Sequence, residues 1–374
     1  MSSLLLESTE LAGICLKNRF VRSAIWDGLA DERGYSTPLL TKYMTDLAQG
    51  GVGLIITGHA YVLPEGQAHH HQIAIYDDSY IPALTALTSS VHKNGGKIVL
   101  QIAHAGFRAD HNLSGMVALA PSVVDENGVP ICKEMTIKEI KRTIGAFGDA
   151  ARRAKEAGFD GVQIHGGHGY LVNQFLAPYF NRRHDEYGGD LINRMRFLLD
   201  ITKSIRNKAG DEYPVMLKIN SEDFFERGFS LDEMLEVSRI LEKEGAVDAI
   251  EMSGGNSYRG IGKYSPVRTY GMKEKNRDDV WYRASAQKYK EKISIPLILV
   301  GGIRSLEVAE ELFRSDTADY ISMARPFICE PDIVNRWKSG NIERAECISC
   351  SLCFINLLDG KGLGCPLHQL PKGC

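Results

Sequence analysis

Residues 295–324 read IPLILVGGIRSLEVAEELFRSDTADYISMA, and this stretch sets the pattern for most of the chain. Two short apolar runs, Ile295–Gly301 and Asp319–Ala324, flank the segment Ser305–Phe313, whose apolar residues recur at helical spacing. A nearly continuous apolar run of this length is typical of a parallel strand that is buried on both faces. The stretch therefore predicts one strand–helix–strand unit.

Six further apolar runs of strand length precede this unit, with helix-like segments between them. They are Arg19–Ala24, Val52–Gly58, Lys97–Ala103, Gly161–His165, Val215–Asn220 and Asp248–Ser253. Eight strands, each followed by a helix, over roughly 320 residues is the count of a TIM (β/α)8 barrel. A doubly wound open sheet is the alternative, but no G-x-G-x-x-G loop follows the first strand. We predict an α/β barrel over residues 1–343 and a short Cys-rich extension over residues 344–374.

Composition excludes several classes of protein. Of the 374 residues, 44% are hydrophobic and 24% are charged, as in an average globular protein, which excludes disorder, collagen and coiled coil. The formal net charge is −3 and no basic block occurs, so neither nucleic acid nor a membrane surface is an expected partner. The apolar runs are strand-sized and the N-terminus does not resemble a signal peptide. The cysteines crowd the C-terminus instead of spreading through the fold, which favours a reduced cytoplasm.

Barrel enzymes carry their chemistry at the carboxyl ends of the strands, and polar residues gather there in this sequence. His165 and His168 follow the fourth strand. They could form a metal-binding pair, or a pair of donors that holds a substrate oxygen. No Asp or Glu at neighbouring strand ends completes a metal shell. Tyr170, two positions further on, provides a phenol that can donate a proton.

The last two strands end in a pattern that suits a phosphate group. Gly301 and Gly302 follow the seventh strand, and Ala324 and Arg325 follow the eighth. Exposed backbone N–H groups and a guanidinium group bind a phosphate dianion well. The alternative is two ordinary turns with a surface arginine. We favour the phosphate site because both turns lie where the loops of a barrel converge.

A long motif around the fourth strand resembles a known family. Residues 158–178, GFDGVQIHGGHGYLVNQFLAP, and residues 181–189, NRRHDEYGG, resemble the signature of the old yellow enzyme family of FMN-dependent ene-reductases. Supporting matches are NRFVRS at 18–23, QIAHAG at 101–106, SGG at 253–255, VGGI at 300–303 and ARPF at 324–327. The resemblance covers nearly the whole chain, from about Leu11 to Arg344, and the fourth-strand motif is too long for a chance match.

The resemblance implies an enzyme that holds FMN non-covalently, takes electrons from NADH or NADPH and reduces the C=C bond of an α,β-unsaturated compound. In such an enzyme His165 and His168 would hydrogen-bond the carbonyl or nitro oxygen of the substrate, and Tyr170 would protonate its α-carbon. The implied FMN-binding residues comprise the isoalloxazine contacts and the phosphate cradle. They are Ser23, Ala24, Ile25, Ala60, Gln101, Lys218, Gly301, Gly302, Ala324 and Arg325.

Two positions depart from the family pattern. Lys218 stands where the family often has Arg, which keeps a cation beside the flavin but loses the bidentate fork. The first strand continues Ser23-Ala-Ile-Trp26, where close relatives carry Ser-Pro-Met followed by Cys or Thr. Trp26 either lines the substrate pocket or belongs to the core. Substrate size and flavin potential therefore cannot be carried over from the family.

The C-terminal extension contains a ligand-like run of cysteines. Cys347, Cys350, Cys353 and Cys365 have the spacing of thiolates that hold a [4Fe–4S] cluster or zinc, although unliganded thiols remain an alternative. The run resembles the cluster-binding branch of the family, with dienoyl-CoA reductase and trimethylamine dehydrogenase. We favour the [4Fe–4S] cluster and regard Cys374, at the terminus, as incidental.

The sequence thus favours an NAD(P)H:flavin oxidoreductase that acts on a small electron-poor alkene. The nearest alternative is a flavin amine dehydrogenase or N-demethylase that passes electrons through an iron–sulfur cluster to a partner protein. A metal-dependent hydrolase using His104, His165 and His168, or a flavin-binding protein without turnover, is less favoured. Family members are often oligomers, which leaves a homo-oligomer open.

Overall fold

The computed structural model describes residues 3–256, 280–358, 360 and 362–369, so Cys374 lies outside the described residues. Eight parallel strands form a closed barrel, because the β11–β6 and β15–β3 pairings complete the ring. Its strands are β3 (Phe20–Arg22), β4 (Leu54–Ile56), β6 (Ile98–Ala103), β11 (Gly161–Gly166), β12 (Val215–Asn220), β13 (Ala249–Ser253), β14 (Leu297–Val300) and β15 (Tyr320–Met323). The predicted TIM barrel is confirmed, and the open sheet is excluded by the ring closure.

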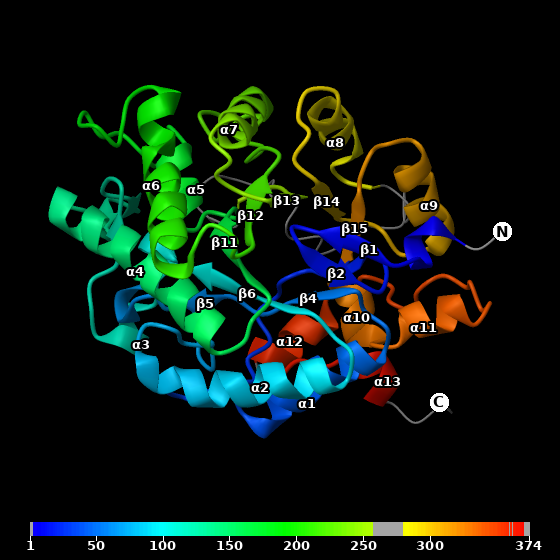
Figure 1. Cartoon of the computed structure of the whole chain (residues 1–374). Helices are drawn as coiled ribbons and strands as arrows, with labels where there is room; N and C mark the ends of the chain where they lie inside the picture. Colours follow the sequence, from blue (N-terminus) through cyan, green and yellow to red (C-terminus); the bar gives the residue numbers. More distant parts are fainter. Residues whose placement is uncertain (1–2, 257–279, 359, 361, 370–374) are drawn as a thin grey trace.

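Helices surround this barrel, as Figure 1 shows. They are α1 (Pro38–Gln49), α2 (Ile81–Lys93), α4 (Ile137–Glu156), α6 (Leu191–Ala209), α7 (Leu231–Lys243), α8 (Arg283–Lys290) and α9 (Leu306–Arg314). Capping motifs in the sequence fix the first residue of two of these helices. Thr136 and Glu139 form a capping box at the start of α4, and Ser230 and Glu233 form one at the start of α7.

A hairpin that the sequence did not predict closes the amino end of the barrel. Strands β1 (Thr9–Leu11) and β2 (Ile14–Leu16) pair antiparallel ahead of the first barrel strand. Leu11, Ile14 and Leu16 pack into a buried cluster with apolar residues from the strand beginnings. The hairpin therefore fills the end of the barrel that carries no chemistry.

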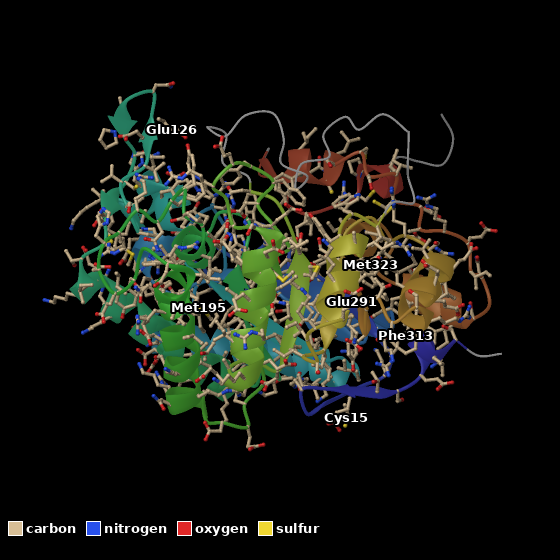
Figure 2. The ribbon with its side chains drawn as sticks, turned by 90° about the horizontal axis from the view of Figure 1, so that it is seen from above. Cys15, Glu126, Met195, Glu291, Phe313 and Met323 are labelled. Carbon is tan, nitrogen blue, oxygen red and sulfur yellow. The ribbon has the colours of Figure 1, made fainter. Side chains whose placement is uncertain are left out.

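Two additions lie at the opposite, carboxyl end. The excursion after β6 contains α3 (His111–Ser114), the paired strands β7 (Leu119–Ala120) and β10 (Lys133–Glu134), and the ribbon β8 (Asp125–Glu126) with β9 (Val129–Pro130). The second addition, after β15, comprises α10 (Arg325–Cys329), α12 (Leu352–Leu358) and α13 (Pro366–Gln369). Between α10 and α12, helix α11 (Ile333–Lys338) runs to the amino end, where Trp337 packs on Phe20 at the start of β3 and Asn335 donates to Gln49 O. Figure 2 places Glu126 of the excursion and Cys15 of the hairpin on opposite sides of the molecule. None of the described helices is long and apolar enough to cross a membrane.

Candidate active site

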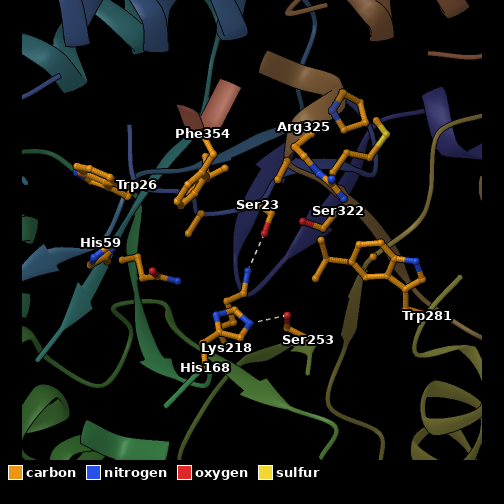
Figure 3. A pocket seen from close by; sticks show the side chains of 18 of the residues that line it. Ser23, Trp26, His59, His168, Lys218, Ser253, Trp281, Ser322, Arg325 and Phe354 are labelled. Atoms are coloured by element: carbon orange, nitrogen blue, oxygen red, sulfur yellow. Dashed lines mark hydrogen bonds between the residues drawn. The ribbon is translucent and has the colours of Figure 1, made fainter. Parts of the chain in front are cut away.

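A cavity of about 320 Å³ opens at the carboxyl ends of the barrel strands. All three predicted catalytic residues and nine of the ten predicted FMN-binding residues line it. Ala60 is the exception, since it lies fully buried in β5 (Ala60–Tyr61), where it pairs with Ile102. Figure 3 labels four of the predicted residues that line it, Ser23, His168, Lys218 and Arg325. The strand-end residues that the sequence singled out are thus brought together in one place.

His165, His168 and Tyr170 form one wall of this cavity. His165 belongs to the end of β11, and its ring stacks on the Tyr170 ring with 4.5 Å between centroids. His168 has a left-handed backbone (φ 58°), which is uncommon for a residue other than glycine. Its backbone N–H donates to Asn220 Oδ1 (3.1 Å), and its Nε2 lies 2.8 Å from Ser253 Oγ. The ends of β12 and β13 therefore hold His168 in place.

Burial sets the protonation state of these three residues. Desolvation is the main cause that lowers the pKa of His165 well below its usual range and that of His168 to about 3, with Lys218 and Arg108 adding to it. Burial also raises the pKa of Tyr170, against the opposing effect of Arg108. At neutral pH the wall therefore presents two neutral imidazoles and a protonated phenol, all able to donate hydrogen bonds.

Lys218 is held in the cavity by a buried carboxylate that the sequence analysis missed. Its Nζ donates to Ser23 Oγ (2.7 Å) and lies 3.2 Å from Glu251 Oε2. Burial alone would raise the pKa of Glu251, but Lys218 and several hydrogen bonds outweigh it and hold this pKa below the usual value. The signal in the sequence was Glu251 itself, a charged residue in the middle of the apolar run DAIEMS.

Gln101 belongs to the same buried network. Gln101 Nε2 donates to Gln163 Oε1 (2.7 Å), and Gln163 Nε2 donates to Glu251 Oε2 (3.0 Å). Ser322 also donates to Glu251, at 2.8 Å. Each of these polar side chains is buried and hydrogen-bonded, so the network fixes the positions of the side chains beneath the cavity.

The predicted phosphate cradle forms another part of the wall. Gly301 and Gly302 have φ angles of 114° and 81°, which favour glycine, and a Cβ on Gly301 would lie 3.0 Å from Tyr282 Cε2. Arg325 begins α10 at this point, and its Nη1 donates to Ser349 O (3.3 Å) and to Ser351 Oγ (3.2 Å). The C-terminal extension therefore reaches the part of the cavity lined by Gly301, Gly302 and Arg325, which the sequence did not predict.

Further residues of the lining were also missed. They are His59, His69, Arg108, Trp281, Tyr282, Arg304, Ser349, Ser351 and Phe354, among others. Trp26 lines the cavity and stacks on His69 with 4.3 Å between centroids. The structure therefore supports the interpretation that Trp26 lines the pocket and not the interpretation that it belongs to the core. No Asp or Glu occurs among the described residues of the lining.

The four predicted ligand cysteines line a second, small cavity. This cavity shares Arg325, Ser351 and Cys353 with the larger one, so the two have a common wall. Cys329 of α10 is an additional thiol, 3.5 Å from Cys365 between sulfur atoms. Burial is the first cause that raises the pKa of Cys353 to about 11. Within the described part of the chain, no three Cys, His, Asp or Glu side chains form a group that could hold a metal ion.

Comparison with known proteins identifies the family. The sequence pattern that defines the NADH:flavin oxidoreductase / NADH oxidase family matches residues 7–343. The chain belongs to this family. It is 35% identical to an NADH oxidase from Thermoanaerobacter brockii over 92% of the chain, but that protein is longer and only 52% of it is matched. The chain thus spans about half the length of this relative.

Other members of the NADH:flavin oxidoreductase family match over their full length. An NADPH dehydrogenase from Clostridium acetobutylicum is 32% identical, with 90% of this chain and 96% of the relative covered. The old yellow enzyme homologue from Zymomonas mobilis has a similar structure, with a TM-score of 0.76 and 26% identity over 92% of this chain and 95% of that one. A barrel of this family can therefore stand alone or within a longer protein.

Proposed function

We propose that this protein is an FMN-dependent reductase that uses NADH or NADPH to reduce the electron-poor C=C bond of a small α,β-unsaturated carbonyl or nitro compound. The observation that carries the proposal is the wall formed by His165, His168 and Tyr170. It combines two neutral N–H donors with a protonated phenol in the cavity that contains the flavin-binding positions of the family.

The described residues fit FMN. Gln101 and Lys218 offer hydrogen-bond donors to the polar edge of an isoalloxazine, and Lys218 adds the positive charge that a reduced flavin needs. Gly301, Gly302 and Arg325 would hold the phosphate through backbone N–H groups and a guanidinium fork. Bound FMN would supply the hydride chemistry that no side chain can perform.

The histidines and the tyrosine would have complementary roles. N–H groups of His165 and His168 would hold the carbonyl or nitro oxygen of the substrate, which becomes more negative as hydride reaches the β-carbon. Donors that point at a developing oxyanion stabilise the transition state more than the ground state. Tyr170 would give its proton to the α-carbon as a general acid.

The charges of the cavity favour a reductase over an amine dehydrogenase or N-demethylase. The described lining contains Arg108, Lys218, Arg304 and Arg325 but no carboxylate. A substrate ammonium group would find no carboxylate among the described lining residues to bind it. An uncharged or anionic acceptor would need no such carboxylate.

We further propose that Cys347, Cys350, Cys353 and Cys365 hold a [4Fe–4S] cluster. Their Cys-x2-Cys-x2-Cys spacing, with a fourth cysteine further on, supports ligation by thiolates. Because these thiols do not form a metal-holding group in the described structure, binding of the cluster would have to draw them closer together. Because Cys353 also lines the larger cavity, a cluster here would lie beside the proposed FMN site. A redox partner protein would then be a second route for electrons.

The test is a comparison of the two half-reactions of the wild-type protein and Tyr170→Phe. Flavin bleaching by NADH or NADPH should stay within about threefold, since the phenol proton has no part in it. Reoxidation by 2-cyclohexen-1-one should slow by about 10²–10⁴-fold, the usual contribution of a general acid. Stopped-flow absorbance at the flavin band measures both rates.

Two outcomes would contradict the proposal. An unchanged rate of reoxidation in Tyr170→Phe would remove Tyr170 from the role of proton donor. Bleaching of the wild-type flavin by secondary or tertiary amines, and not by either nicotinamide coenzyme, would favour the amine dehydrogenase instead. His165→Ala is a companion variant in the same assay. It removes one donor to the substrate oxygen, so the affinity for phenols and for enones such as 2-cyclohexen-1-one should fall.

A further inference from the structure

His59 is a buried residue of the cavity to which the proposed function assigns no task. It follows β4 at the carboxyl end of the barrel and is 7% exposed. Its backbone carbonyl accepts a hydrogen bond from Gln72 Nε2 (3.1 Å). Gln72 Oε1 in turn accepts from the backbone N–H groups of Ala68 (2.8 Å) and His69 (3.2 Å). The fully buried Gln72 therefore fixes the loop that carries His59.

The ring of His59 contacts the predicted proton donor. His59 Nε2 lies 3.2 Å from the hydroxyl oxygen of Tyr170, within hydrogen-bonding distance. The two rings meet edge to face, with 5.3 Å between centroids and 82° between planes. His165 stacks on Tyr170 in a nearly parallel orientation, at 24° between planes. The Tyr170 ring thus packs against both imidazoles, and its hydroxyl group meets His59.

The surroundings of His59 keep its imidazole neutral. Burial is the first cause that lowers its pKa well below the usual range, and His69, His168 and Arg108 lower it further. A neutral imidazole has one N–H donor and one acceptor. If Nε2 accepted the Tyr170 proton, the O–H bond would point away from a substrate. If Nε2 carries the hydrogen, it donates to the Tyr170 oxygen, and the O–H bond is free to point into the cavity.

We propose that His59 is a positioning residue for proton donation: its Nε2–H group donates to the Tyr170 oxygen, aims the phenol O–H at the substrate and stabilises the phenolate that forms. In this step the Tyr170 O–H bond breaks and a C–H bond forms at the α-carbon with the electron pair of the enolate. The O–H electron pair stays on the phenolate, which solvent water reprotonates. This inference rests on the proposed function, because it requires Tyr170 to be the proton donor.

The physical reason is the cost of a buried anion. Burial disfavours the phenolate of Tyr170, as its raised pKa shows. A hydrogen bond from a neutral N–H to a developing anion is about twice as strong as one to a neutral oxygen. Such a donor therefore lowers the barrier for proton transfer more than it stabilises the resting phenol.

The experiment measures the two half-reactions in His59→Leu and His59→Gln, each with and without Tyr170→Phe. His59→Leu removes the donor and should slow reoxidation by 2-cyclohexen-1-one by about 10–10²-fold. Its solvent deuterium isotope effect should rise, because proton transfer becomes rate-limiting. His59→Gln supplies an amide N–H and should recover most of the lost rate. In the Tyr170→Phe background, His59→Leu should add less than about twofold, since the proton that His59 positions is absent.

His70→Leu is the matched control, because His70 lies on the same segment, is exposed, and contacts Trp26 only through its backbone carbonyl. It should leave reoxidation and the isotope effect at wild-type values. If His59→Leu slowed reoxidation equally in the wild-type and Tyr170→Phe backgrounds, the inference about His59 would be overturned while the proposed function would stand. An unchanged solvent isotope effect in His59→Leu would have the same consequence. Unchanged reoxidation in Tyr170→Phe would instead overturn the proposed function and this inference with it. Flavin content and the thermal midpoint of each variant separate these results from loss of folding.

Discussion

Asp27 carries a buried carboxyl group just behind the cavity. One oxygen accepts from the backbone N–H of Leu29 (3.3 Å), and the other has no hydrogen-bond partner. Burial raises the pKa of Asp27 to about 6, although Arg22 and backbone N–H groups oppose this. The folded state therefore binds a proton more tightly than the unfolded chain. This contribution to stability is present below pH 4 and is lost as the pH rises through about 6.

Asp27→Asn should remove this dependence on pH. Relative to the wild-type protein, the variant should gain about 2 kcal/mol in free energy of unfolding between pH 4.5 and pH 7.5, because part of the effect is already present at pH 4.5. Urea unfolding at the two pH values measures it. The buried histidines act in the opposite sense but equally in both proteins, so they cancel in the comparison. A difference between the two proteins that is the same at both pH values would contradict the assignment.

At the scale of single residues, the sequence predicted the residues that form the wall of the site but not the residues that hold them in place. His165, His168 and Tyr170 could be found because they stand directly after a strand, where a barrel places its chemistry. Glu251 lies opposite Lys218 in the β12–β13 register, and only the paired strands show that they meet. His59 contacts Tyr170 across 111 residues of sequence. A pattern along one segment carries no information on such distant partners.

At the scale of elements, the loop between Cys347 and Cys353 has unusual geometry. Ser349 and Ser351 both adopt positive φ angles, 60° and 62°, which are uncommon for serine. Arg304 donates to Ser349 Oγ (2.8 Å), and Arg325 donates to Ser351 Oγ (3.2 Å). Each such backbone conformation costs about 1–3 kcal/mol and persists only where its surroundings hold it. The two arginines, which both line the larger cavity, therefore tie the cysteine loop to its wall.

This loop provides the test of the proposed cluster. Anaerobically purified protein should contain about four irons per chain and a broad absorption beneath the flavin bands. Cys350→Ser should lose most of the iron and keep the flavin, because Cys350 lines only the second cavity. Cys15→Ser, an exposed thiol in the hairpin, should keep both. Wild-type protein without iron, or Cys350→Ser with full iron content, would overturn the cluster assignment.

Elements also differed in how far the sequence predicted them. Seven of the eight expected apolar runs contain a barrel strand, because a strand buried on both faces needs apolar residues throughout. The eighth, Gly161–His165, falls one residue short of the end of β11. The β1–β2 hairpin and the strands of the excursion have only two or three residues each. Such segments are too short to show a period, so they could not be predicted. Helix α12 was missed as well, because its seven residues, LCFINLL, are too few to show a helical period.

At the scale of the whole molecule, stability and chemistry occupy opposite ends of the barrel. Ile14 of the hairpin is 5% exposed and packs in the cluster that fills the amino end, together with Val21, Met216 and Ile298. The cavity opens at the carboxyl end, and none of these residues lines it. Damage to the amino end should therefore reach the site only through global unfolding.

Ile14→Ala tests this separation. Removing the buried side chain leaves a cavity that the closed ring of strands cannot fill, so the free energy of unfolding should fall by about 2–5 kcal/mol. The affinity for FMN and the rates of both half-reactions should stay within about twofold of the wild-type values at 25 °C. Cys15→Ala, at the exposed neighbouring position, should change neither stability nor rates. If Ile14→Ala slowed reoxidation by 2-cyclohexen-1-one while the protein stayed folded, packing at the amino end would be shown to control the geometry of the His165–Tyr170 wall.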